Sequence, residues 1–177
     1  METGRLILRR WRPEDRAPFA AMNSDPRVTD FLGGNLTGAE SDAMAERFDQ
    51  HFDRHGFGLF AAELKSDGAF IGDIGLAVPN FEAHFTPCVE IGWRLAFPCW
   101  GQGLATEGAR AVLDYAFLTL KLDEIVSFTV PANMGSRRVM EKLGLTRDPR
   151  DDFDHPRLPE GHPLRRHVLY RIRRSLK

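Results

Sequence analysis

The chain has 177 residues, of which 42% are hydrophobic and 28% charged, values that suit a single globular domain over residues 1–177 and argue against disorder. Its formal net charge of −1 gives no general attraction to nucleic acid or acidic membranes, and no apolar run is long enough to cross a bilayer. The sequence has only two cysteines, no apolar leader and no convincing set of metal ligands. It therefore predicts a cytoplasmic protein without a disulfide framework or a bound metal.

Apolar periodicity and turn residues predict an alternation of strands and helices. In chain order, we expect a strand at 5–9, helices starting at 13 and 37, strands at 57–64, 69–78 and 89–95, a helix over 104–118, a strand at 125–130, a helix over 133–144 and a strand at 167–172. Strands 57–64 and 69–78 should form a hairpin. The natural packing of this order is one mixed sheet with helices on both faces, in which strands 89–95 and 125–130 are parallel.

The segment 100–106 reads Trp-Gly-Gln-Gly-Leu-Ala-Thr, and it joins strand 89–95 to an amphipathic helix. Gly101 and Gly103 let the backbone approach a ligand closely, and the helix start behind them offers free N–H groups and a positive dipole end. Such a turn is typical of a phosphate site. Gly103 is followed by Leu104, so the turn lacks the lysine of a P-loop. Thr106 stands where a dinucleotide fingerprint needs glycine or alanine.

Four segments together resemble the GNAT superfamily of N-acetyltransferases, and within it the RimJ/RimL-like branch. They are the N-terminal strand with Arg12-Pro13-Glu14-Asp15, then Glu90-Ile91-Gly92-Trp93, the turn at 100–107, and 133–144 with Asn133, Ser136 and Gly144. The resemblance covers nearly the whole chain. It implies an α/β fold of the GNAT type: a mixed, mostly antiparallel sheet with helices on both faces and a splayed parallel strand pair at the cofactor site. It also implies acetyl-CoA as co-substrate.

The resemblance carries the cofactor contacts onto specific positions. Main-chain N–H groups of 102–106 are expected on the pyrophosphate, backbone groups of 95–97 near the acyl carbonyl, Asn133 on the pantetheine amide, and Arg137 and Arg138 at the adenosine end. The expected cofactor-binding residues are Leu95, Ala96, Phe97, Gly101, Gln102, Gly103, Leu104, Ala105, Thr106, Asn133, Ser136 and Arg137.

Acetyl transfer to an amine needs a neutral amine and a proton donor for the departing thiolate. Glu90 is the candidate base, directly or through a water, and its alternative role is that of a structural carboxylate between strands. Ser136 is the candidate proton donor, although a serine there also suits the first turn of a helix. Asn133 is equally well explained as a plain N-cap. Residues 131–144 lack the tyrosine often found in this superfamily, which leaves the identity of the acid open.

For the acceptor, the resemblance favours Phe31, His155 and His162 as pocket residues. We expect an acetyl-CoA-dependent transferase that acts on a primary amine, either a protein N-terminus or a small amine, by direct attack in a ternary complex. The alternative is a non-catalytic acyl-CoA-binding or regulatory protein. A homodimer is a candidate assembly. His51 and His55 have helical ligand spacing but lack the Glu of a metalloprotease motif, so we expect a surface pair.

Overall fold

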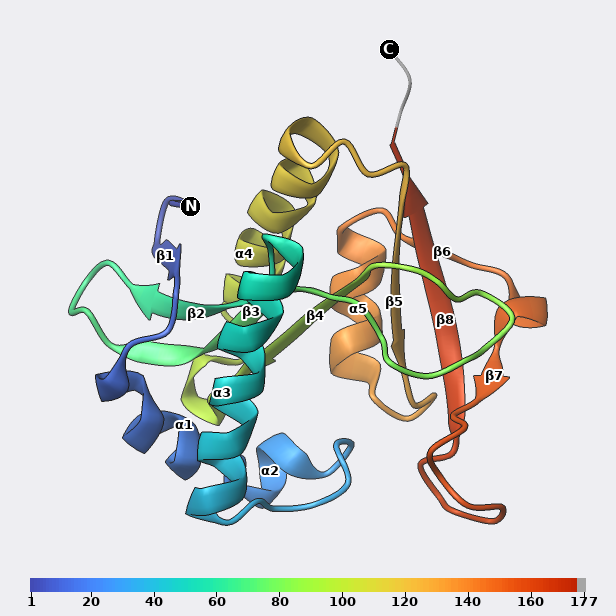
Figure 1. Cartoon of the computed structure of the whole chain (residues 1–177), viewed down its shortest axis with the longest axis horizontal. Helices are drawn as coiled ribbons and strands as arrows, with labels where there is room; N and C mark the ends of the chain where they lie inside the picture. Colours follow the sequence, from blue (N-terminus) through green and yellow to red (C-terminus); the bar gives the residue numbers. More distant parts are fainter. Residues whose placement is uncertain (175–177) are drawn as a thin grey trace.

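The computed structural model describes residues 1–174 and contains an eight-stranded sheet with helices on both faces (Figure 1). The strands are β1 Leu6–Arg9, β2 Leu59–Leu64, β3 Phe70–Ala77, β4 Glu90–Leu95, β5 Glu124–Thr129, β6 Thr146–Arg147, β7 Phe153–Asp154 and β8 Arg166–Arg173. Their order in space is β1-β2-β3-β4-β5-β8-β6, with β7 paired to β8. Strands β4 and β5 are parallel and the other described pairs antiparallel, as the sequence predicts.

The helices are α1 Arg16–Asn23, α2 Pro26–Thr29, α3 Gly38–His55, α4 Leu104–Asp114 and α5 Met134–Lys142. Helix α3 starts with the expected capping box, in which Thr37 and Glu40 satisfy each other's backbone N–H groups. It ends at Gly56, whose left-handed conformation closes the last turn. No helix among residues 1–174 is both long enough and apolar enough to cross a membrane.

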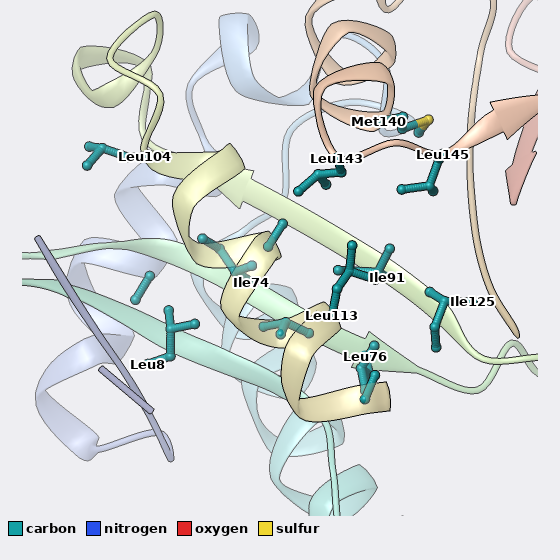
Figure 2. Packing of buried hydrophobic residues seen from close by; sticks show 14 of the residues in the cluster. Leu8, Ile74, Leu76, Ile91, Leu104, Leu113, Ile125, Met140, Leu143 and Leu145 are labelled. Atoms are coloured by element: carbon teal, nitrogen blue, oxygen red, sulfur yellow. The ribbon is translucent and has the colours of Figure 1, made fainter. Parts of the chain in front are cut away.

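Helix α4 packs on one face of the sheet and forms the larger core. Figure 2 shows Ile74 and Ile91 from the central strands beside Leu113 of α4, with Met140 of α5 close by. Ile74, Ile91 and Val112 are fully buried. Removing this apolar surface from water stabilises the fold by roughly 25 cal/mol per Å². The strand-to-helix junction after β4 therefore adjoins the larger apolar cluster, to which Leu95 and Leu104 both belong.

Helices α1 and α3 cover the opposite face with a second apolar cluster. Its buried members include Phe19, Met22 and Ala45, and Trp11 packs edge-on against Phe19 at 4.8 Å between ring centroids. The two clusters give the sheet a helical layer on each side. Asn23, the last residue of α1, reaches Arg94 on the face of β4 that also carries Glu90.

The structure adds elements that the sequence pattern did not predict. Helix α2 and strands β6 and β7 are only two to four residues long, too short for a periodic signal. The helix predicted over 104–118 is α-helical only to Asp114, because residues Tyr115–Thr119 form a π-helical turn that changes the helical phase. Leu118 is 68% exposed as a result.

Candidate active site

A cavity of about 550 Å³ lies where β4 and β5 separate. Only Glu90 and Val126 are paired between these strands, and the Val126 N–H donates to the Val89 carbonyl at 3.0 Å. Beyond that pair the strands diverge, and both the 90–95 segment and the 127–129 segment line the cavity. Parallel neighbours normally bond along their length. The gap leaves main-chain groups of β4 and β5 free to meet a ligand.

The turn at 101–103 closes one end of this cavity. Gly101 and Gly103 have φ angles of 74° and 79°, a conformation that L side chains rarely adopt. Leu104, Ala105 and Thr106 follow as the first turn of α4, and all three line the cavity. The first N–H groups of a helix have no intrahelical acceptor. The start of α4 therefore turns main-chain N–H groups without helical acceptors toward the cavity, and their role in binding an anion stays a prediction.

A charged cluster supports this turn from outside the cavity. Glu107, in the first turn of α4, accepts hydrogen bonds from Thr3 Oγ1 at 2.6 Å and from the Arg5 N–H at 2.8 Å. The Arg5 guanidinium bonds Glu107 Oε2 at 2.7 Å and the Gln102 carbonyl at 3.0 Å. The segment that precedes β1 thereby fixes the turn to the helix. Sequence reasoning missed this cluster because its members are about a hundred residues apart.

Glu90 lies at the opposite end, where β4 and β5 are still paired. Burial raises the pKa of its carboxyl group to about 8. A carboxylate with a pKa near that of an α-amino group, about 7.7–8.0, is suited to exchange a proton with it. Within residues 1–174 the Glu90 carboxyl group makes no hydrogen bond to a neighbouring strand, as the alternative structural role would require; burial is what shifts its pKa.

Asn133 and Ser136 lie where α5 begins, on the far wall of the cavity. Asn133 caps the helix: its Oδ1 accepts from the Ser136 N–H at 3.1 Å, and its Nδ2 donates to Thr129 Oγ1 at 3.1 Å. These bonds use one Oδ1 lone pair and one Nδ2 hydrogen, so the side chain keeps further bonding capacity. Capping and ligand contact are compatible here.

The structure brings most of the predicted site residues to the cavity. The residues that line it are Phe31, Glu90, Leu95, Gly101, Gly103, Leu104, Ala105, Thr106, Asn133 and Ser136. Ala96, Phe97, Gln102 and Arg137 are outside the lining set, although all four adjoin it in sequence. Arg138 lines the cavity, whereas Arg137 donates to the Pro131 carbonyl at 3.0 Å.

The backbone at the end of β4 is partly committed to other bonds. The Ala96 N–H donates to the Ile71 carbonyl at 2.9 Å, and the Leu95 carbonyl accepts from Trp100 Nε1 at 2.7 Å. Phe97 begins a short 3-10 helix, so its own N–H has no acceptor within that helix. Of the main-chain N–H groups expected near the acyl carbonyl, that of Ala96 is thus already used in a hydrogen bond to Ile71.

The two predicted acceptor histidines lie away from the cavity lining. His155 packs against Phe81 at 4.7 Å between ring centroids and against His167 at 5.2 Å. Burial lowers the pKa values of both His155 and His167. His162 accepts a bond from the Leu164 N–H at 3.1 Å, which fixes the local loop. Their roles toward an acceptor stay predictions.

The cavity is also lined by polar residues that the sequence did not point to, among them Asp73, Arg94 and Ser127. Arg94 shares the Glu90 face of β4 by strand alternation, a signal available from sequence. The position of Asp73 in the cavity could not be predicted without the register of β3 and β4, which pairs Asp73 with Arg94.

The surface prediction for the His51–His55 pair is only half right. His55 is exposed, but His51 is half-buried and bonds the Phe57 carbonyl at 2.8 Å and the Val78 N–H at 2.9 Å. His51 thus joins α3 to the hairpin. Within the described residues, no group of three or more His, Cys, Asp or Glu side chains is placed to hold a metal ion.

Comparison with known proteins agrees with this geometry. The chain is 31% identical to the Bacillus subtilis protein YkkB over 144 residues, which cover 81% of this chain and 83% of YkkB. It is 42% identical to the Aspergillus fumigatus FsC-acetyl coenzyme A-N(2)-transacetylase over 95 residues, 51% of this chain and 40% of that protein.

Among solved structures, an acetyltransferase from Agrobacterium tumefaciens superposes with a TM-score of 0.78 at 29% identity. The superposition covers 98% of this chain and 94% of that one. The family model described as an acetyltransferase (GNAT) domain matches residues 5–146. The splayed strands, the glycine turn and these matches agree, and the chain belongs to the GNAT acetyltransferase family.

Proposed function

We propose that this protein transfers an acetyl group from acetyl-CoA to a primary amine by direct attack in a ternary complex. One observation carries the proposal: a single cavity joins the glycine turn at the start of α4 to Glu90 through the gap between β4 and β5. The Aspergillus fumigatus relative is named as an acetyl coenzyme A N(2)-transacetylase, which supports the same donor and a nitrogen acceptor.

The residues of the cavity fit this donor. Main-chain N–H groups of 101–106 would hold its pyrophosphate at the positive end of α4. Free backbone groups of β4 and Asn133 would bond its pantetheine arm, and Arg138, which lines the cavity, would meet its adenosine end. Acetyl-CoA supplies an acetyl group already activated as a thioester. No metal enters the proposal.

Glu90 acts as the base in this scheme. An ammonium cannot attack, so the acceptor must lose a proton, which Glu90 takes directly or through a water. Because burial raises the pKa of Glu90 to about 8, the carboxylate form becomes abundant only in mildly alkaline solution, where α-amines also become neutral.

Ser136 is the proposed proton donor. The chain has two tyrosines, and neither lines the cavity: Tyr115 Oη donates to the Gly56 carbonyl at 3.4 Å, and Tyr170 Oη donates to Glu141 at 3.1 Å. The Ser136 hydroxyl lies at the first turn of α5 on the cavity wall. This placement supports a hydroxyl donor in place of the phenol common in the superfamily.

The four motifs of the sequence favour the RimJ/RimL-like branch, whose members acetylate protein N-termini and other amines. We therefore propose a protein N-terminus or a small amine as the acceptor, in the cytoplasm, with Phe31 in the acceptor pocket. His155 and His162 remain candidates on the segment 155–165 between β7 and β8. A homodimer is the assembly that we would test first.

The deciding experiment measures thiol release from acetyl-CoA with a panel of N-terminal peptides and small amines, alongside CoA binding by calorimetry. We expect turnover with at least one amine, and loss of turnover with retained CoA binding in Glu90→Gln and Ser136→Ala. CoA binding without turnover for any amine would support the alternative, a non-catalytic acyl-CoA-binding protein. Absence of CoA binding would overturn both.

A further inference from the structure

Glu90, Gly92 and Arg94 form a row along one face of β4, and all three line the cavity. Gly92 leaves the middle of the row open: a Cβ there would meet only Leu59 Cδ2, at 3.9 Å. Along this face of β4 the cavity therefore meets first a carboxyl group, then a gap and then a guanidinium group. The Cα atoms of Glu90 and Arg94 are about 13 Å apart, at about 3.3 Å per residue.

A buried polar chain holds Arg94 in place. Its Nη1 donates to Asn23 Oδ1 at 2.6 Å, and Asn23 Nδ2 donates to Ser41 Oγ at 2.9 Å. Asn23 and Ser41 are both fully buried, so the chain reaches from α1 to α3 without contact with solvent. Most buried polar groups in folded proteins have a hydrogen-bond partner, and these three side chains supply each other's. The guanidinium is consequently fixed in orientation at the cavity wall.

The charge of Arg94 is not fully paired within the described residues. Asp73 is its cross-strand neighbour on β3 and is 3% exposed. Asp73 Oδ1 and Arg94 Nε are nonetheless both buried without a hydrogen-bond partner among residues 1–174. Burial raises the pKa of Asp73 to about 6, and the positive charge of Arg94 opposes that rise. A guanidinium with unused N–H groups at a cavity wall has bonding capacity for a ligand.

We propose that Arg94 binds a carboxylate of the acceptor, so that preferred acceptors are small molecules carrying both a primary amine and a carboxylate. The amine lies toward Glu90, the carboxylate toward Arg94, and the connecting chain passes over Gly92. This inference rests on the proposed function and narrows its acceptor class. A polyamine would place a second cation against Arg94, which the site disfavours. Asp73 keeps Arg94 compensated in the free protein and competes with the acceptor carboxylate for it.

The test is equilibrium binding to the full chain saturated with CoA, by calorimetry. The probes are ω-amino carboxylates from glycine to 6-aminohexanoate and their matching carboxamides. We expect one chain length to bind about tenfold tighter as the carboxylate than as the carboxamide, the gain typical of a hydrogen bond to charged partners. Arg94→Gln should abolish that preference, whereas Asp73→Asn should enlarge it.

Opposite responses of the two variants separate recognition from a general loss of structure. Arg47→Gln, an exposed arginine of α3, is the matched control and should keep the wild-type preference. If Arg94→Gln does not fold, Arg94→Lys and Asp73→Asn still give the comparison, with a reduced and an enlarged preference expected. Equal affinity of the wild-type protein for carboxylates and carboxamides, or tighter binding of N-terminal peptides than of every carboxylate probe, overturns the inference.

Thiol release tests acetyl transfer, and the carboxylate preference tests the role of Arg94, so the two measurements can fail independently. Thiol release with neutral amines at normal rates, together with no carboxylate preference, leaves the acetyltransferase proposal standing and overturns only the role of Arg94. Conversely, absence of thiol release with every amine overturns the proposed function, while the binding preference still decides whether Arg94 recognises a carboxylate.

Discussion

At the 101–106 end of the cavity the groups available to a ligand are mainly main-chain N–H groups, whereas at the Glu90 end they are side chains from separate strands. The first arrangement depends on glycines and a helix start, which are contiguous in sequence. The second depends on strand register and on the contact between α1 and Arg94 of β4. A site made of main-chain N–H groups tolerates side-chain substitutions, so it suits the part of the ligand that is the same in every reaction. A site made of side chains can be altered one residue at a time, and such changes can alter the acceptor.

The largest expected effect is the loss of turnover when the side-chain end alone is changed. Glu90→Gln should lower kcat by roughly 10²–10⁴-fold, the usual contribution of a general base, with CoA affinity nearly unchanged. Thiol release and calorimetry at pH 8 measure the two quantities. Glu82→Gln, an exposed glutamate, serves as control. An equal loss of CoA affinity in Glu90→Gln would show that the two ends are not separable.

The same substitution should stabilise the protein in a pH-dependent way. Glu90 has its pKa raised from 4.5 to about 8, so the folded state binds a proton that the unfolded state has lost in that window. Wild-type stability therefore falls as the pH rises from about 4.5 to about 8. At pH 8 Glu90→Gln should gain on the order of a few kcal/mol, at about 1.4 kcal/mol per pKa unit, and little at pH 4.5.

Urea denaturation across this pH range tests the prediction, with Glu82→Gln again as the control. A gain for Glu90→Gln that is the same at every pH would contradict burial as the cause of the raised pKa.

The backbone end is tested by Gly101→Ala. Gly101 and Gly68 have φ angles of 74° and 73°, and no atom lies within 4 Å of a Cβ built on either. Both alanine variants should lose about 1–2 kcal/mol of folding stability from the left-handed backbone. Only Gly101→Ala should weaken CoA binding, by about tenfold if the turn relaxes to avoid that strain. Comparable CoA affinity in the two variants would remove the turn from the binding site.

A smaller effect is expected from the cluster that supports the turn. Glu107→Gln keeps the size of the side chain but removes the charge bonded by Arg5 and Thr3. The Arg5 side chain is 51% exposed, so solvent screens much of this pair and its contribution is at most about 1 kcal/mol. CoA affinity should fall by a few-fold at most, and less at high salt. A loss above tenfold would mean that Glu107 does more than hold the turn.

The contrast between the two ends also explains what the sequence could predict. Gly101, Gly103 and the helix start at Leu104 lie side by side in the chain, so their chemistry could be read locally. The capping box of α3 and the hairpin of β2 and β3 were predictable for the same reason. The fold class followed from the order of such local signals.

The Glu90 end could be predicted only in part. Alternation along β4 places Arg94 on the face of Glu90, but the Asn23–Ser41 chain that fixes it joins α1 to α3. Asp73 lies beside Arg94 only because of the register between β3 and β4. The Arg5–Glu107 cluster is likewise formed by segments distant in sequence. No local pattern announces contacts of this kind, because they depend on how the elements pack.

Two of the three tryptophans, Trp93 and Trp100, line the cavity, whereas Trp11 packs among Phe19, Phe48 and Phe70. Trp100 is 46% exposed and its indole N–H bonds the end of β4. The molecule thus has two natural fluorophores, Trp93 and Trp100, at the cavity, and a third, Trp11, outside its lining. Intrinsic fluorescence, with a Trp100→Phe variant to identify the source, can therefore follow ligand occupancy in real time without any attached dye.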